Sequence, residues 1–260
     1  LDNEEIIADL ELSDLVPRIY ERQNDEVITH SITNDDCASF VAPQDGFSRG
    51  VNSIFSFDLT SSAFTFEADH IIGNYPLVYS SADALILAEK SWDSWWFWNS
   101  DDSNEATNIH MFDISDSGST EYIASGRVDG TIQNQFSLSE YQGVLRVAST
   151  EGQWGRWWLD NPEPMTSNVV TLQPITDATG HTTLEQIGII EGIAPNETIW
   201  SARFVEDRAY IVTFENMDPL WTIDLSDPTN PTIMGELKIP GVSTYIHPIS
   251  DNTLLTIGMG

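Results

Sequence analysis

The chain has very little of the residue chemistry on which most zinc and catalytic sites depend. Its 260 residues include one cysteine, Cys37, which excludes an internal disulfide, a CxxC redox pair and a cysteine-based zinc site. The five histidines show no HxH or HxxxH spacing, so a zinc cluster is not expected. No GxSxG, GxxxxGKS/T or GxGxxG motif occurs. The sequence therefore lacks the common local signatures of hydrolases and nucleotide-binding proteins.

Basic residues are also scarce. Ten lysines and arginines stand against 41 acidic residues, which gives a formal net charge of −31. Nucleic-acid binding requires cationic side chains at the phosphates, so we expect no nucleic-acid partner, and docking on an anionic membrane surface is disfavoured. No apolar run reaches the roughly 18 residues that span a bilayer, so we expect no membrane insertion. The chain begins at Leu1 and shows no signal peptide, and we interpret it as a fragment of a longer protein.

Aromatic residues, in contrast, are abundant. Nine tryptophans, eleven phenylalanines and seven tyrosines supply more apolar area than a disordered acidic chain would carry. We therefore expect a folded domain whose stability depends on salt, because the surface carboxylates repel one another.

The chain contains a repeat of about 55 residues. One strand type is centred on residues that are 55, 60 and 51 positions apart: Phe57, Phe112, Leu172 and Ile223. A second type, apolar on both faces, recurs at 84–88, 144–148, 209–213 and 253–257. Before each copy of the second type lies another run with a tight polar turn: 75–81, 135–141, 199–205 and 244–249. A further run follows each copy of the first: 63–72, 121–128, 184–193 and 232–239.

This order of strands predicts an all-β fold made of four-stranded antiparallel units, and radial repetition of such units is typical of a β-propeller. Strands that are apolar on both faces fit middle strands packed between neighbouring blades. We expect about four blades as part of a larger ring, although the two ends of the chain could instead share one blade and close a four-bladed ring. The predicted domains are an N-terminal segment, 1–50, and blades over 51–260, divided at about 51–73, 75–130, 132–193, 198–240 and a partial blade at 243–260. The N-terminal segment has helical spacing only over 3–15, before Pro17, and a possible extra strand at 26–33.

Several of these segments resemble a known family. They are 107–115, 142–150, 191–204 and, as the most specific match, 207–214 continuing through 218–231 to 235–241. They are similar to secreted bacterial "beta propeller domain" proteins, and the last also looks like a short surface-protein propeller repeat centred on Ile-Asp-Val-Ser-Asp-Pro. The resemblance covers roughly residues 50–260. It implies a propeller that is secreted, periplasmic or at the cell surface, and it supplies no catalytic residues.

Seven of the nine tryptophans occupy the same predicted loop in two successive units. They are Trp92, Trp95, Trp96, Trp98, Trp154, Trp157 and Trp158. Loops that join the second and third strands of propeller blades emerge on one face, so these rings are expected to lie near one another. They could form an aromatic platform for a protein or a glycan, or they could pack together as a local core that caps the ring.

The first of these loops also gathers carboxylates. Asp93, Asp101, Asp102 and Glu105 offer the hard oxygen ligands that Ca²⁺ takes, which makes Ca²⁺ the one candidate cofactor. Their spacing matches no EF-hand, so a solvated acidic loop is the alternative interpretation.

Three aspartates recur at equivalent strand ends, at Asp58, Asp113 and Asp224. One active site does not need an acid in every unit, so we interpret them as turn residues that accept hydrogen bonds from nearby backbone amides. His110 aligns with bulky or apolar residues and is interpreted as a core histidine.

These patterns favour a non-catalytic, extracytoplasmic binding module that recognises a protein or a glycan through its tryptophan-rich loops, with Ca²⁺ as a candidate aid. Two alternatives remain open: a purely structural propeller within a surface protein, and a hydrolase that uses two carboxylates on the same face.

Overall fold

The computed structural model describes residues 3–11, 14, 16–32, 40–42, 50–91, 105–152, 164–214, 218–239, 241–250 and 252–259. The chain forms two compact units, residues 1–75 with 116–121, and residues 76–115 with 122–260. We call them unit 1 and unit 2. Strands dominate both of them, which confirms the predicted all-β class. No helix in the described ranges has the length and apolarity needed to traverse a lipid bilayer.

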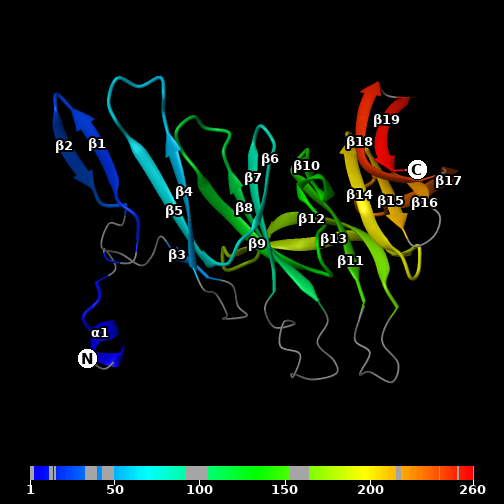
Figure 1. Cartoon of the computed structure of the whole chain (residues 1–260), viewed down its shortest axis with the longest axis horizontal. Coiled ribbons are helices and arrows are strands. Elements are labelled where there is room, and N and C mark those ends of the chain that lie inside the picture. The colour runs from blue at the N-terminus through cyan, green and yellow to red at the C-terminus, as the bar shows by residue number, and fades with distance from the viewer. Residues whose placement is uncertain are drawn as a thin grey trace. The chain divides into compact units, whose positions relative to one another are not determined.

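Unit 1 contains the helix and two small sheets (Figure 1). Its elements are α1 (Asn3–Ala8), β1 (Ile19–Gln23), β2 (Glu26–His30), β3 (Phe40–Val41), β4 (Gly50–Phe57) and β5 (Phe66–Gly73). β1 pairs with β2, and β3, β5 and β4 form a three-stranded sheet in that order. The predicted extra strand at 26–33 corresponds to β2, whereas its partner β1 was not predicted.

The predicted helix over residues 3–15 is interrupted, because α1 ends at Ala8 and residues 9–11 are not helical, although Asp14 is helical again. The helix has no basic residue in its last turn, and Asp9 and Glu11 follow it directly. Carboxylates near the carboxyl end of a helix oppose its dipole, which disfavours continuation.

The main part of unit 2 is an eight-stranded sheet built from two successive antiparallel meanders. The first consists of β6 (Leu77–Ser80), β7 (Ala84–Lys90), β8 (Ala106–Asp113) and β9 (Glu121–Asp129). The second consists of β10 (Leu138–Tyr141), β11 (Val144–Glu151), β12 (Thr166–Thr176) and β13 (Thr182–Ile193). The meanders meet where β13 pairs with β9 in parallel, at Thr183 and Ser125.

Two further sheets complete unit 2. β14 (Thr198–Val205), β15 (Arg208–Phe214), β16 (Asp218–Asp224) and β17 (Thr232–Ile239) form a third antiparallel meander in chain order. β18 (Val242–Ser250) and β19 (Thr253–Met259) form a two-stranded sheet (Figure 1). One predicted run differs from the structure: residues 135–141 begin with a 3-10 turn, η2 (Gln135–Ser137), before β10 starts. The Asn134 side chain caps this turn by accepting a hydrogen bond from the Phe136 amide.

The strand register confirms the repeat alignment at three of its four positions. Phe112 lies opposite Leu85, Leu172 opposite Leu145, and Ile223 opposite Ala209. In each meander the partner is the second residue of the second strand. Successive meanders therefore have the same local structure at the same sequence positions.

The core of unit 2 lies on both faces of these middle strands. One apolar cluster consists of side chains from the eight-stranded sheet and includes Ile86, Leu145 and Val170. A second cluster joins that sheet to the third meander through residues such as Val169 and Ile211. His110 is also buried, with its Nδ1 3.3 Å from the Tyr122 hydroxyl, as expected for a core histidine.

Candidate functional site

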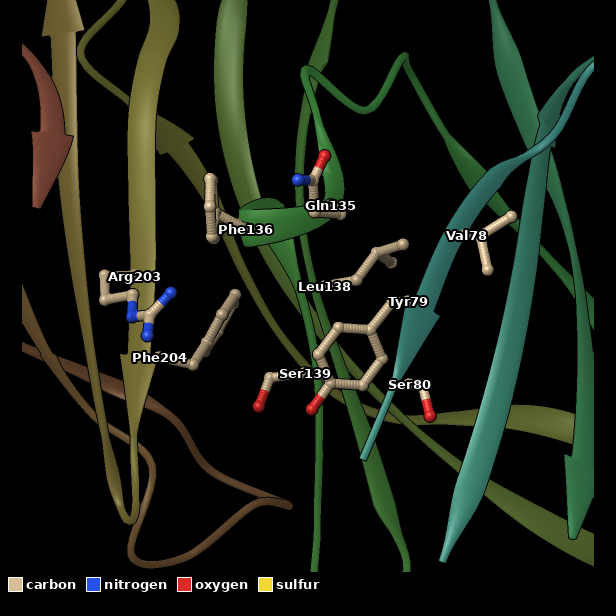
Figure 2. Close-up of a pocket in the computed structure, with 9 residues that line it drawn as sticks. All are labelled: Val78, Tyr79, Ser80, Gln135, Phe136, Leu138, Ser139, Arg203 and Phe204. Atoms are coloured by element: carbon tan, nitrogen blue, oxygen red, sulfur yellow. The ribbon is translucent and has the colours of Figure 1, made fainter. Parts of the chain in front are cut away.

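The first strands of the three meanders surround a pocket in unit 2 (Figure 2). Its volume is about 360 Å³, at the small end of the range for ligand sites. It is lined by residues of β6, η2, β10 and β14: Val78, Tyr79, Ser80, Gln135, Phe136, Leu138, Ser139, Arg203 and Phe204. None of these described lining residues is an acid, a histidine or a cysteine. The lining therefore offers aromatic rings, hydroxyls, an amide and one cation.

Arg203 is the charged residue of this lining. Its guanidinium carbon lies 5.2 Å from the centre of the Phe136 ring, which is a cation–π contact. Phe136 is held by the capped η2 turn, and its ring also meets Tyr245 of β18 edge-on at 5.5 Å. Within the described part of the chain, the Arg203 side chain makes no hydrogen bond or ion pair. Its donors are thus available to a molecule in the pocket.

A second arginine, Arg146, stands behind the pocket wall and has the opposite character. It is buried, and its guanidinium donates to the Ser139 hydroxyl at 2.6 Å and to the Glu206 carbonyl. Its guanidinium carbon lies 5.1 Å from the centre of the Tyr141 ring and 5.3 Å from that of Phe204. Burial lowers the pKa of Arg146, yet a guanidinium stays charged in proteins. Arg146 therefore fixes Ser139 and Phe204, two residues of the lining.

Glu140 holds the first strands β6 and β10 together. Its backbone amide donates to the Tyr79 hydroxyl at 3.2 Å, and its Oε2 accepts from the Ser81 hydroxyl at 2.9 Å. Its Oε1 accepts from the Gly143 amide at 2.8 Å. The carboxylate is thus committed to positioning the strands. The Tyr79 hydroxyl, which accepts here, keeps its own proton for another acceptor.

The predicted tryptophan platform lies outside the described residues, at all seven of its positions: Trp92, Trp95, Trp96, Trp98, Trp154, Trp157 and Trp158. The structure does describe the strand ends from which both loops begin and to which they return. Glu105 and Thr107, at the end of the first loop, bond to Gly130: the Gly130 amide donates to the Glu105 carbonyl at 2.6 Å, and the Thr107 hydroxyl donates to the Gly130 carbonyl at 2.9 Å.

The next residue along the chain reaches the second loop. Thr131 and Thr150 exchange two backbone hydrogen bonds, of 2.8 and 3.0 Å, and Thr150 lies at the end of β11, where the second loop begins. The connection from β9 to β10 therefore ties the bases of the two tryptophan loops together. The same connection continues into η2 and the pocket.

The candidate calcium ligands fall mostly outside the described residues as well, at Asp93, Asp101 and Asp102. Glu105 is described, and its Oε1 accepts from Lys90 Nζ at 3.0 Å. Among the residues that the structure places, no group of three or more His, Cys, Asp or Glu side chains could hold a metal ion.

The repeated aspartates form turns, as the sequence indicates. Asp58, Asp113 and Asp224 each accept from the backbone amide of the residue two positions later, at 2.8–2.9 Å. Hydrogen bonds from the hydroxyl and the amide of that residue lower the pKa of all three carboxyls. A carboxylate held in its charged form by local turn bonds is suited to ending a strand, not to exchanging protons.

A family model described as the beta propeller domain matches residues 2–260. This chain belongs to the β-propeller domain family. A propeller made of antiparallel meanders is consistent with the strand order of unit 2.

Two curated relatives of this propeller are archaeal proteins that carry the name "uncharacterized protein". The one from Methanocaldococcus jannaschii is 43% identical over 136 residues, which are 52% of this chain and 20% of the relative. The one from Archaeoglobus fulgidus is 32% identical over 208 residues, which are 80% of this chain and 30% of the relative. The matched regions thus span less than a third of the length of either relative. The bacterial origin that the sequence resemblance implied has no support in them.

The propeller pocket was missed by sequence reasoning, although its strands were found. Tyr79, Phe136 and Arg203 all lie in the predicted first-strand runs. One signal was present: Arg203 is a basic residue inside one of the predicted first-strand runs, in a chain with 41 acids and only ten bases.

Proposed function

We propose that this chain is the propeller portion of a non-catalytic, extracytoplasmic binding protein. In this proposal β6–β9, β10–β13 and β14–β17 are four-stranded blades, and β18–β19 is the inner half of another. The binding face is the end of unit 2 from which the two tryptophan-rich loops emerge, and its partner is a glycan or a protein surface. The strand order and the family membership support the blades.

The observation that carries the proposal is the shared base of the two loops. Gly130 and Thr131, adjacent in the chain, bond to the ends of the first and second loop respectively. Loops that start from one hydrogen-bonded base are placed to act on one partner. Seven tryptophans on such loops would supply large, rigid contact area with hydrogen-bond donors at low entropic cost.

A binding role also fits the pocket lining better than acid–base catalysis does. The described lining has no carboxylate or imidazole, and the repeated aspartates are engaged in turns. The hydrolase alternative needs two convergent carboxylates, and the described lining residues of the pocket include none.

The test combines Trp96→Ala with Trp157→Ala, which changes one ring in each loop. We expect binding to a glycan microarray, or to a purified cell-surface protein identified as a ligand, to fall at least about tenfold, as is usual when central aromatic anchors are removed. Circular dichroism and the melting temperature should stay unchanged. Trp200→Phe, at a described strand position outside both loops, is the matched control. Unchanged binding by the double variant would refute the platform.

Calcium assistance is a separate part of the proposal. Ca²⁺ bound by Asp93, Asp101, Asp102 and Glu105 would order the first loop. Tb³⁺ titration tests it, because the neighbouring tryptophans would sensitise terbium emission. We expect terbium emission that falls when Ca²⁺ displaces the bound Tb³⁺. The double variant Asp101→Asn, Asp102→Asn should show no such emission. Emission equal to that of this variant would argue against the site.

A further inference from the structure

We infer that the pocket between β6, β10 and β14 is a binding site for a small ring-bearing carboxylate, with Arg203 as the carboxylate's partner. The inference rests only on described residues of unit 2 and does not depend on the tryptophan loops. An aromatic acid and a sugar acid share the required chemistry, which is one carboxylate on a six-membered ring.

The charge of the ligand follows from the isolation of Arg203. Acids outnumber bases fourfold in this chain, and five of its eight described basic side chains contact an oxygen partner, Arg22 among them. Lys90, Arg208 and Lys238 pair with carboxylates, and Arg146 with a hydroxyl and a carbonyl. Arg203 is partly buried and, in the described part of the chain, its guanidinium has the cation–π contact with Phe136 but no hydrogen bond or ion pair. A guanidinium in such a place is costly to leave unpaired and pairs strongly with an anion.

A carboxylate is the anion that fits this pocket best. The planar guanidinium presents its donors as a fork, which matches the two oxygens of a carboxylate. The pocket volume of about 360 Å³ suits one ring with its substituents rather than a polymer. The lining excludes acidic residues, so a bound carboxylate meets no like charge from the described lining.

The rest of the lining selects for a ring that carries a hydroxyl. Phe136, Phe204 and Leu138 present apolar surface, and Figure 2 shows the hydroxyls of Tyr79 and Ser139 near each other, with Phe204 between Ser139 and Arg203 in this view. Both hydroxyl oxygens already accept, from the Glu140 amide and the Arg146 guanidinium respectively. Each can therefore still donate its proton to an oxygen on the far side of a ligand.

The side chains that line the pocket are held in position before any ligand binds. Arg146 holds Ser139 and packs on Phe204, and the Asn134 cap holds Phe136 in η2. Glu140 fixes Tyr79 from the neighbouring strand. A lining that is already positioned loses little side-chain entropy on binding, which favours a real affinity for a small molecule.

The experiment is isothermal titration of the full chain with 4-hydroxybenzoate and with glucuronate. The neutral counterparts 4-hydroxybenzamide and glucose are matched controls. We expect at least one acid to bind with a dissociation constant of about 1 mM or tighter and its neutral counterpart to bind at least about tenfold more weakly, which is the value of a charge-assisted pair. The acid that binds shows whether the ligand carries an aromatic ring or a sugar ring.

Variants place the binding in the pocket. Arg203→Gln should weaken acid binding at least about tenfold, and Arg203→Lys less, because lysine keeps the charge but loses the fork. Arg208→Gln is the matched control, since Arg208 is a partly buried arginine on the next strand that pairs with Asp207 and does not line the pocket. It should change binding less than twofold, within about 0.5 kcal/mol.

A variant that blocks the pocket tests whether binding can be lost while the protein stays folded. Val78 lines the pocket but is 54% exposed, so Val78→Trp should fold normally and abolish binding by filling the pocket. The Trp96→Ala, Trp157→Ala variant should bind the acid like the wild type, which separates this site from the proposed loop platform. Equal affinity for acid and neutral compound, no effect of Arg203→Gln, or no binding of either acid at about 20 mM would overturn the inference.

Discussion

The third meander of unit 2 and the β18–β19 sheet contain the same kind of middle strand in two different settings. Ala209, Ile211 and their neighbours in β15 are buried on both faces. In β19, by contrast, Leu255, Ile257 and Met259 are exposed, although the strand is equally apolar. The difference shows that burial here is decided by the neighbours of a strand and not by its composition.

Those neighbours can be named. Ala209 and Ile211 pack toward the eight-stranded sheet, in the cluster that includes Val169. Tyr210 and Val212 point the other way and pack with Ile246 of β18. β19 has such a neighbour on one face only, where Leu254 joins the same cluster. In the described structure its other face, with Leu255 and Ile257, remains exposed.

The largest expected effect compares the isoleucines of these two strands. Ile211→Ala should destabilise the protein by about 2–5 kcal/mol, because it removes a fully buried side chain and leaves a cavity. Ile257→Ala should cost less than about 1 kcal/mol, because its side chain is 59% exposed. Urea unfolding followed by far-UV circular dichroism measures both. Similar losses would mean that β19 is covered on both faces in solution.

A smaller effect is expected from two threonines. The Thr171 hydroxyl is buried and lies 2.6 Å from the Pro228 carbonyl and 3.1 Å from that of Gly188, so it links β12 to the connection between β16 and β17. Thr171→Val should cost about 1–3 kcal/mol, because a buried carbonyl loses its donor. Thr244→Val removes a similar bond to the Ile257 carbonyl, but at an exposed site.

For Thr244→Val we expect a change within about 0.5 kcal/mol, since water replaces the hydroxyl. Denaturation midpoints of the two variants under identical conditions give the comparison. If Thr244→Val were the more damaging change, the β18–β19 sheet would be the more tightly packed region.

The smallest expected effect is a change in local stability when the pH is lowered. Hydrogen bonds from the Ser226 hydroxyl and amide lower the pKa of Asp224 below its usual 3.8, so this carboxylate stabilises the folded state above pH 3.8. The contribution is lost as the pH falls through the lower, folded-state pKa. Among its described residues the β18–β19 sheet contains no carboxylate.

Lowering the pH should therefore weaken the turn after β16, where Asp224 loses its charge. The β18–β19 sheet should show no such change, because its described residues include no carboxylate. Amide hydrogen exchange at Ser226, corrected for intrinsic rate, should speed up between pH 5 and pH 3 in the wild type. In Asp224→Asn it should be fast at both pH values. An unaltered exchange rate at Ser226 in the wild type would show that this bond contributes nothing in solution.

The strands of unit 2 could be predicted from sequence because they depend on local patterns. A middle strand that is apolar on both faces, such as 144–148, followed at a regular interval by a second apolar strand, was enough to align Phe112, Leu172 and Ile223 in the correct register. An Asp follows the aligned residue after Phe112 and Ile223, but not after Leu172. Polar turns such as Gln142-Gly143, where both residues have positive φ, marked the hairpins.

The pocket could not be predicted in the same way, because it depends on contacts between sheets. Arg203 and Phe136 are 67 positions apart, and no local pattern brings their side chains together. The short strands β1 and β3 escaped prediction for a related reason. β3 consists only of Phe40 and Val41, and it exists because β5 offers a parallel edge to pair with.

Gly130 has a consequence for how the loop-bearing end of unit 2 can vary. With φ at +85°, it sits so close to Thr150 that a Cβ atom would collide with the Thr150 carbonyl oxygen. The separation of the two loop stems is consequently set by backbone touching backbone, independently of any residue within the loops. A change of sequence within either loop should therefore leave the spacing between the stems unchanged.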